Sequence, residues 1–308
     1  MERTDWIVPT GGREKSTTAR AAILVALSLA ALKLAAGLLT GSIAVLASAA
    51  DSLMDAFASG VNYAAIRFAD EPEDTSHRFG HGKVEGMAGL FQAAVIGASA
   101  AFLIVESVRR LVSGGAVEVP LVGIGVMVVS LVATILLVLR MRRVAKESES
   151  LALEADSLHY LSDVLTNGAV LLGLLAVAWL DVAWVDPVAS LIISAALVWT
   201  VVQVFRESVD NLMDRELPDE ERERILRIAE REVPGVLGVH DLRTRRSGAR
   251  RFVVIHVEID RRVPFVEAHR RSEQVVRAVE AGLPYTRVTV HADPWPPERG
   301  DDPDGAGR

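Results

Sequence analysis

Long apolar stretches separated by short polar segments fill the first two thirds of the chain. Six of them, at residues 20–40, 42–68, 84–112, 119–141, 150–180 and 184–208, reach the length of about 20 helical residues that crosses a bilayer. The pattern predicts an α-helical membrane protein with six transmembrane helices over residues 20–208, preceded by a polar cytoplasmic tail at 1–19.

From residue 209 the pattern changes to short amphipathic elements. A charged helix with Ile225 and Ile228 on one face is followed by two alternating strands around a Ser-Gly turn, a second helix and a third strand. This α-β-β-α-β order predicts a small open sheet with helices on one face over residues 209–295. The Pro-, Gly- and Asp-rich residues 296–308 are predicted to be disordered.

The placement of Lys and Arg orients the predicted spans. The connecting segments on the same side of the membrane as the N-terminus carry nearly all of these residues, and the connections at 40–42 and 181–187 on the opposite side carry none. Arg109 and Arg110, near the opposite side, are the exception. We therefore expect a multi-pass protein of the cell (inner) membrane with both termini in the cytoplasm. The chain has no signal-peptide pattern and no cysteine, and no basic stripe with aromatics that would indicate nucleic acid binding.

Four ionisable residues interrupt the second and fifth predicted spans. Asp51 and Asp55 are spaced to share one helix face, as are His159 and Asp163, and both pairs lie about 15–18 Å deep in the membrane. One charged carboxylate at that depth costs about 3 kcal/mol, so the set requires a neutralising partner. The bland alternative is a set of helix–helix hydrogen bonds.

A divalent cation or protons could neutralise this set. Three aspartates and a histidine suit a tetrahedral, zinc-like ion, although carboxylates also accept manganese and iron. Because ligands must be deprotonated to bind metal, protons and metal compete for the same atoms, which provides a mechanism of exchange. Gly60 and Gly168 follow the second carboxylate of each pair at equal spacing, a weak signal of two inverted halves.

Asp156 and Lys33 are also ionisable and lie within the predicted spans. Asp156 shares the face of His159 and Asp163 nearer the cytoplasm, where it would assist metal access or favour the first turns of its helix. Lys33 is expected to snorkel or to pair rather than to transport.

The remaining histidines lie in one loop and in the C-terminal region. Asp74, His77 and His81 are spaced so that they could converge on one ion, and an ordinary solvated loop is the alternative. Strand alternation directs His256, His291 and Asp293 away from the apolar face, and His240 and His269 are nearby in sequence. These residues could form a metal site between strands or subunits, or be isolated exposed histidines.

Six segments of the chain form a recognisable set: SIAVLASAADSLMD, PEDTSHRFGHGKVE, ADSLHYLSDVLTNG, MDRELPDEE, GVHDLRTRRSG and VHADP. Together they resemble the cation diffusion facilitator family, specifically its bacterial zinc/iron/cadmium efflux branch, and the resemblance spans roughly residues 18–295. It implies a homodimeric metal/proton antiporter in the lipid bilayer, with six membrane helices and a ferredoxin-like, metallochaperone-like α/β cytoplasmic domain. Zn2+ is the first expectation for the ion, and Cd2+, Fe2+ and Mn2+ are the alternatives.

The resemblance also assigns roles by position. It implies a tetrahedral transport site, a loop site, a binuclear cytoplasmic site at the dimer interface, and a charged pair that locks the third and sixth helices across the dimer. The residues are, in that order, Asp51, Asp55, His159 and Asp163; Asp74, His77 and His81; His240, His256, His291 and Asp293 with His269 close by; and Lys83 with Asp214.

Two other classes of protein are alternatives to a transporter. An intramembrane metalloprotease would need an HExxH-type helix, which the chain lacks, so we expect no enzyme. A membrane metal sensor without transport could use the C-terminal histidines, but it leaves the costly intramembrane cluster unexplained.

Overall fold

The computed structural model describes residues 12–113, 121–180 and 185–295. These residues divide into two compact units, one ending at Leu212 and the other beginning at Met213. The predicted boundary at residue 209 therefore lies within the last long helix. Residues 1–11 and 296–308 of the two predicted tails lie outside the described residues, and residues 12–19 are helical.

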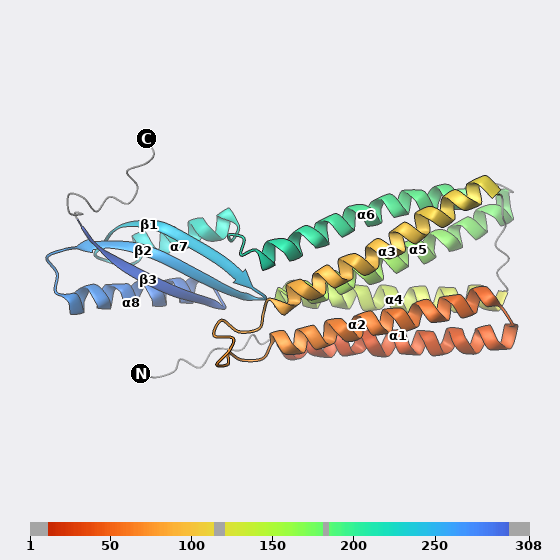
Figure 1. The fold of residues 1–308 in the computed structure, drawn as a ribbon, viewed down its shortest axis with the longest axis horizontal. Coiled ribbons are helices and arrows are strands. Elements are labelled where there is room, and N and C mark those ends of the chain that lie inside the picture. The colour runs from red at the N-terminus through yellow and green to blue at the C-terminus, as the bar shows by residue number, and fades with distance from the viewer. Residues whose placement is uncertain (1–11, 114–120, 181–184, 296–308) are drawn as a thin grey trace. The chain divides into compact units, whose positions relative to one another are not determined.

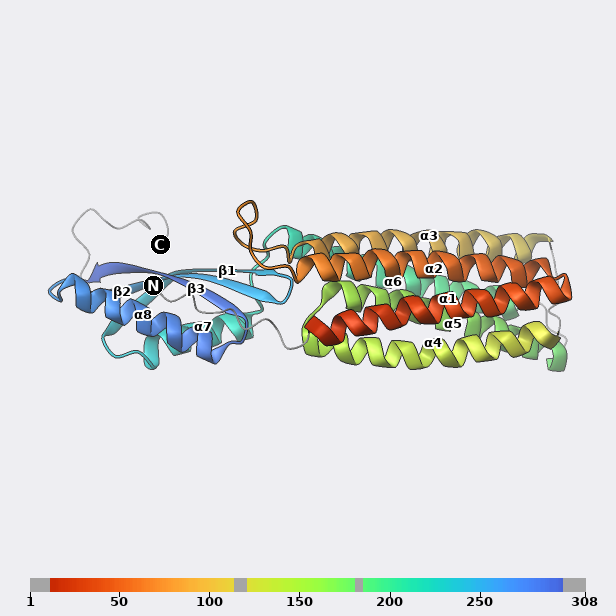
Figure 2. The same ribbon diagram turned by 90° about the horizontal axis from the view of Figure 1, so that it is seen from below.

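The long helices of the first unit lie side by side, as Figures 1 and 2 show. They are α1 (Gly12–Thr40), α2 (Ile43–Ala69), α3 (Val84–Ser113), α4 (Leu121–Ser148), α5 (Leu151–Leu180) and α6 (Val185–Leu212). The six predicted spans are confirmed as helices. Within the described residues, α1, α3, α4 and α6 each contain a stretch long and apolar enough to cross a membrane, and α2 and α5 carry the ionisable clusters.

Helices α1 and α4 extend furthest beyond the apolar stretches that predicted them. Helix α1 begins at Gly12 rather than residue 20, and α4 continues to Ser148 rather than ending near 141. The extension of α1 is stabilised because the ammonium of Lys15 is buried and lies 2.6 Å from Asp70 and 3.0 Å from Glu85. Hydropathy alone does not detect helical turns whose charges are satisfied by neighbouring helices.

The second unit contains the predicted α-β-β-α-β order: α7 (Asp219–Arg231), β1 (Val236–Ser247), β2 (Arg250–Asp260), α8 (Phe265–Gly282) and β3 (Thr286–Trp295). Strands β1 and β2 are antiparallel and are joined by a tight turn in which Gly248 has a positive φ of 60°. Strands β2 and β3 are parallel, so α8 provides the crossover between them. Figure 2 shows both helices on one face of the sheet, as predicted.

One hydrophobic core fills the space between these helices and the sheet. Val253, Ile255 and Val257 of β2 are buried in it with Ile228 of α7 and Val275 of α8. Because side chains alternate along a strand, His256 points to the opposite face, beside neighbouring strands whose histidines are in register with it. The predicted alternation is confirmed, and it leaves a polar face on which a site can form.

Candidate metal-binding sites

Helices α2 and α5 bring three of the four predicted intramembrane ligands together. The Nε2 atom of His159 lies 3.1 Å from Asp55 Oδ1 and 3.7 Å from Asp163 Oδ2. One potential ligand atom from each residue falls within 4.8 Å of the other two. The i,i+4 spacing on α5 places His159 and Asp163 on one face, and Asp55 meets them from α2.

The fourth predicted ligand is not part of this group in the described structure. Asp51 lies one turn along α2 from Asp55 and is exposed. Within the group, the buried Oδ2 atom of Asp163 and the Nδ1 atom of His159 have no hydrogen-bond partner among the described residues. Because buried polar atoms are normally paired, Asp163 retains an oxygen that a cation could use.

Two charged side chains flank the group, and both are buried. Lys33 donates a hydrogen bond of 2.8 Å to the hydroxyl of Ser52 on α2, so it pairs rather than snorkels. Asp156 lies one turn before His159 on α5 and is fully buried, with hydrogen bonds to α2 and α3. The sequence placed Asp156 on the correct helix face but did not identify its partners.

The loop between α2 and α3 gathers the predicted Asp74, His77 and His81. Each histidine has a ring nitrogen 3.3 Å from an oxygen of Asp74, and the two rings are 4.5 Å apart. The backbone N–H groups of His77 and Ser76 donate to Asp74, and these bonds lower the pKa of its carboxyl to about 2. The loop therefore holds an ionised carboxylate beside two imidazoles, the donor types that borderline metals accept.

A third group forms on the polar face of the sheet. The Oδ2 atom of Asp293 lies 3.2 Å from His240 Nε2 and 2.9 Å from His256 Nδ1. The Nε2 atom of His291 lies 3.2 Å from the other oxygen of Asp293. Strand register explains the convergence, because His256 of β2 is paired with His240 on one side and with His291 on the other.

The structure adds two carboxylates that the sequence analysis missed. An oxygen of Asp241 lies 3.6 Å from His256 Nε2, and an oxygen of Glu258 lies 3.6 Å from His240 Nδ1. Strand pairing shifts register between His240 and Arg243, and Asp241 has a positive φ of 45° there. Such a bulge redirects side chains and defeats simple alternation. The sequence signal for Asp241 was its position directly after His240.

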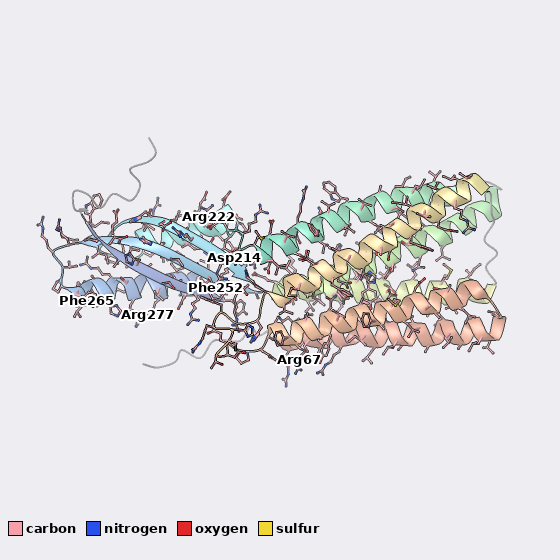
Figure 3. All side chains as sticks on the ribbon, viewed as in Figure 1. Arg67, Asp214, Arg222, Phe252, Phe265 and Arg277 are labelled. Atoms are coloured by element: carbon pink, nitrogen blue, oxygen red, sulfur yellow. The ribbon has the colours of Figure 1, made fainter. Side chains whose placement is uncertain are left out.

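His269 does not join this group within the described chain. It is exposed on α8, and its ring stacks against Phe265 at a centroid distance of 6.3 Å; Figure 3 labels Phe265 near the start of that helix. Helix α8 covers the apolar face of the sheet, whereas His256 lies on the other face. Any role of His269 in the predicted site would require another arrangement or a second subunit.

The two members of the predicted charged pair each contact their own unit. The ammonium of Lys83 donates a 2.9 Å hydrogen bond to the carbonyl oxygen of Leu212. The carboxylate of Asp214, labelled in Figure 3, lies 3.2 Å from the guanidinium of Arg245, which in turn stacks over the ring of Phe252 at 4.7 Å. A lock across a dimer stays a prediction.

Comparisons with known proteins agree with this division of the chain. The family described as "Cation efflux transmembrane domain" matches residues 19–213, and "Cation efflux protein, cytoplasmic domain" matches residues 217–295. The cation-efflux pump FieF of Salmonella arizonae is 42% identical over 285 residues, which cover 92% of this chain and 94% of that protein. FieF of Cronobacter sakazakii is 41% identical over 283 residues, with the same two shares.

Solved structures of other proteins match part of this chain. The zinc form of CzrB is 38% identical and covers 27% of this chain and 93% of that chain, with a TM-score of 0.26. The two family domains and the near full-length relatives correspond to the helical unit and the sheet unit described above. The chain is therefore a cation efflux protein of the cation diffusion facilitator family, with a helical transmembrane domain followed by a cytoplasmic domain.

Proposed function

We propose that this protein exports a divalent metal ion, Zn2+ in the first place, from the cytoplasm in exchange for protons. The observation that carries the proposal is the convergence of Asp55, His159 and Asp163 from two helices of the transmembrane domain. Ionisable groups within a membrane domain are costly and are retained mainly where they serve a pathway. Relatives of this chain bear the name cation-efflux pump, which agrees with such a pathway.

The donor set favours a small, borderline ion. The group offers two carboxylates and an imidazole, and Asp51 lies one turn along α2, where a modest change of its side chain or helix would supply a fourth ligand. Four donors of this type suit tetrahedral Zn2+, and a carboxylate-rich set also accepts Cd2+, Fe2+ or Mn2+. Asp51, Asp55, His159 and Asp163 thus form the proposed transport site.

Exchange follows from competition between the ion and protons. A metal arriving from the cytoplasm displaces protons from the ligands, since only the deprotonated groups bind it. After the helices expose the site to the opposite side, incoming protons occupy the same atoms and release the ion. The metal-loaded site and the protonated site each carry less net charge than the empty, ionised site. The free-energy cost of reorienting the site within the apolar membrane is therefore lower for both of them.

The other two groups are proposed to bind metal without being the transport path. The loop site would be formed by Asp74, His77 and His81. The group on the polar face of the sheet would form the cytoplasmic site and would join two copies of the chain in a homodimer. We propose that the Lys83–Asp214 pair connects α3 and α6 of that dimer. In the proposed orientation of the protein, the helices cross the inner membrane and both termini lie in the cytoplasm.

The cytoplasmic assignment is tested by metal removal. If His240 is a ligand, chelation lowers the thermal midpoint of the wild-type protein and leaves that of His240→Ala nearly unchanged. Thr289→Ala is the control, because Thr289 is an exposed β3 residue outside the group; it should respond to chelation like wild type. An equal response of His240→Ala and wild type contradicts the assignment.

The transport proposal is tested by zinc flux in proteoliposomes under an imposed pH gradient. We expect gradient-driven flux in wild type and its loss in Asp51→Ala and Asp163→Ala. Glu106→Gln is the matched control, because this α3 carboxylate faces Arg109 instead, at 4.0 Å; it should transport like wild type. Unchanged flux in folded Asp163→Ala refutes the site. If folded wild type moves no zinc but moves manganese, iron or cadmium, the ion assignment is wrong; movement of none of them refutes transport.

A further inference from the structure

A buried carboxylate that none of the proposed metal sites uses lies beside the transport site. Asp156 is 0% exposed and lies one helical turn before His159 on α5. A carboxylate sealed from solvent is costly unless hydrogen bonds and neighbouring charges compensate it. The contacts of Asp156 should therefore identify its role.

Asp156 connects three helices. Ser59 of α2 lies with its hydroxyl 3.2 Å and 3.3 Å from the two carboxylate oxygens, and the amide of Gln92 on α3 donates a 2.7 Å hydrogen bond to Oδ1. The Ser59 hydroxyl also lies 2.9 Å from the phenol oxygen of Tyr160, which follows His159 on α5. Ser59 and Gln92 are completely buried, and Tyr160 is 2% exposed. We refer to Asp156, Ser59, Gln92 and Tyr160 as the α5 clasp.

The clasp lies in register with the proposed transport site. Ser59 follows Asp55 by one turn of α2, and Asp156 precedes His159 by one turn of α5. The two helices therefore meet at Asp55–His159 and again, one turn nearer the C-terminal end of α2, at Ser59–Asp156. The link between Ser59 and Asp156 therefore fixes the axial register of α2 and α5 at the Asp55–His159 contact.

The transport site needs such a link when it holds no metal. Its carboxylates come from both helices and repel one another when ionised, which tends to separate α2 from α5. The hydrogen bonds of the clasp involve no proposed metal ligand, so they persist whether or not an ion is bound. Preorganisation of this kind raises the affinity of a metal site, because less reorganisation is required on binding.

We propose that Asp156 is a positioning residue for metal transport: through Ser59 and Gln92 it holds α2 and α5 in the register that the transport site requires. This inference rests on the proposed function. Asp156 acts here as a hydrogen-bond acceptor, not as a metal ligand or a proton carrier. Its charge is therefore less important than its shape and its two acceptor oxygens.

The test is the zinc concentration dependence of flux in proteoliposomes containing the full chain. Loss of supporting hydrogen bonds typically weakens a metal site by about 10–100-fold. We expect Asp156→Ala to raise the half-saturating zinc concentration by about that factor with a smaller change in maximal flux. Asp156→Asn should be close to wild type, because Asn still accepts from Gln92 and bonds to Ser59.

Two further substitutions guard against a variant that fails to fold. Ser59→Ala and Gln92→Ala each remove one partner of Asp156, and each should raise the half-saturating concentration. Ser157→Ala is the matched control, because the neighbouring Ser157 is 1% exposed but its hydroxyl donates within α5, to the carbonyl of Glu154 at 2.7 Å. It should leave zinc saturation unchanged.

The outcomes separate this proposal from the transport assignment. If Asp163→Ala still transports, the transport site itself is wrong. If Asp163→Ala is inactive while Ser59→Ala and Gln92→Ala saturate like wild type, only the clasp is refuted. A loss in Asp156→Asn as large as that in Asp156→Ala also overturns the proposal, since it would show that the negative charge is required.

Discussion

The buried ion pair at the start of α1 provides the sharpest stability prediction. Lys15 contacts two carboxylates, Asp70 at 2.6 Å and Glu85 at 3.0 Å, and the Glu85 side chain is 1% exposed. Among the described residues, the Glu85 carboxylate also accepts a 2.8 Å hydrogen bond from the hydroxyl of Ser150. Lys15→Met keeps most of the buried volume but leaves the Glu85 carboxylate with a single hydroxyl donor.

The expected cost follows from burial. Removing one partner of a buried pair destabilises a protein by about 3–5 kcal/mol, because the remaining charge is uncompensated. Asp70 is 25% exposed, so solvent screens its charge and its contribution is smaller, about 1 kcal/mol at most. For a unit of this size each kcal/mol corresponds to about 2–4 °C, so the midpoint should fall by roughly 10 °C.

The assay is thermal unfolding of the detergent-purified full chain, followed by loss of helical circular dichroism. The double variant Lys15→Met/Glu85→Met removes both charges and should recover most of the loss, because apolar replacement of a whole buried pair is often neutral. Our reasoning fails if Lys15→Met melts like wild type, or if the double variant is no more stable than the single one.

Two further predictions concern packing and pH. A Cβ atom on Gly89 would lie 2.2 Å from the hydroxyl of Ser208, so Gly89→Ala should destabilise the α3–α6 contact by about 1–3 kcal/mol. At Gly97 the nearest atom is 3.8 Å from such a Cβ, so Gly97→Ala should be tolerated. Equal melting temperatures of the two variants would contradict this prediction. Hydrogen bonds from Arg270 and then Arg271 lower the pKa of Glu267 to about 2. Because the folded-state pKa is depressed, this contribution to stability is complete above about pH 4.5 and is lost as pH falls toward 2. Glu267→Gln should therefore show a weaker loss of stability over that range in acid unfolding of the full chain, and an unchanged pH profile would contradict the prediction.

Local pattern was sufficient to predict most of the architecture. Apolar length predicted six helices because a membrane imposes a minimum span, and the period of two along β2 predicted which face Val253 and Ile255 bury. The i,i+4 spacing predicted that His159 and Asp163 share a face, because this relation is internal to one helix. The extra turns of α1 escaped prediction because their charges are neutralised by residues distant in sequence.

Contacts between elements could be decided only by the tertiary structure. The sequence contained Asp156, Ser59 and Gln92, but only the packing of α2, α3 and α5 brings them together, because no local rule fixes the rotation and register of one helix against another. Similarly, the bulge in β1 brings Asp241 to His256, while α8 carries His269 to the other side of the sheet. Helical and strand periods determine which residues share a face; the packing of those faces determines which residues form a site.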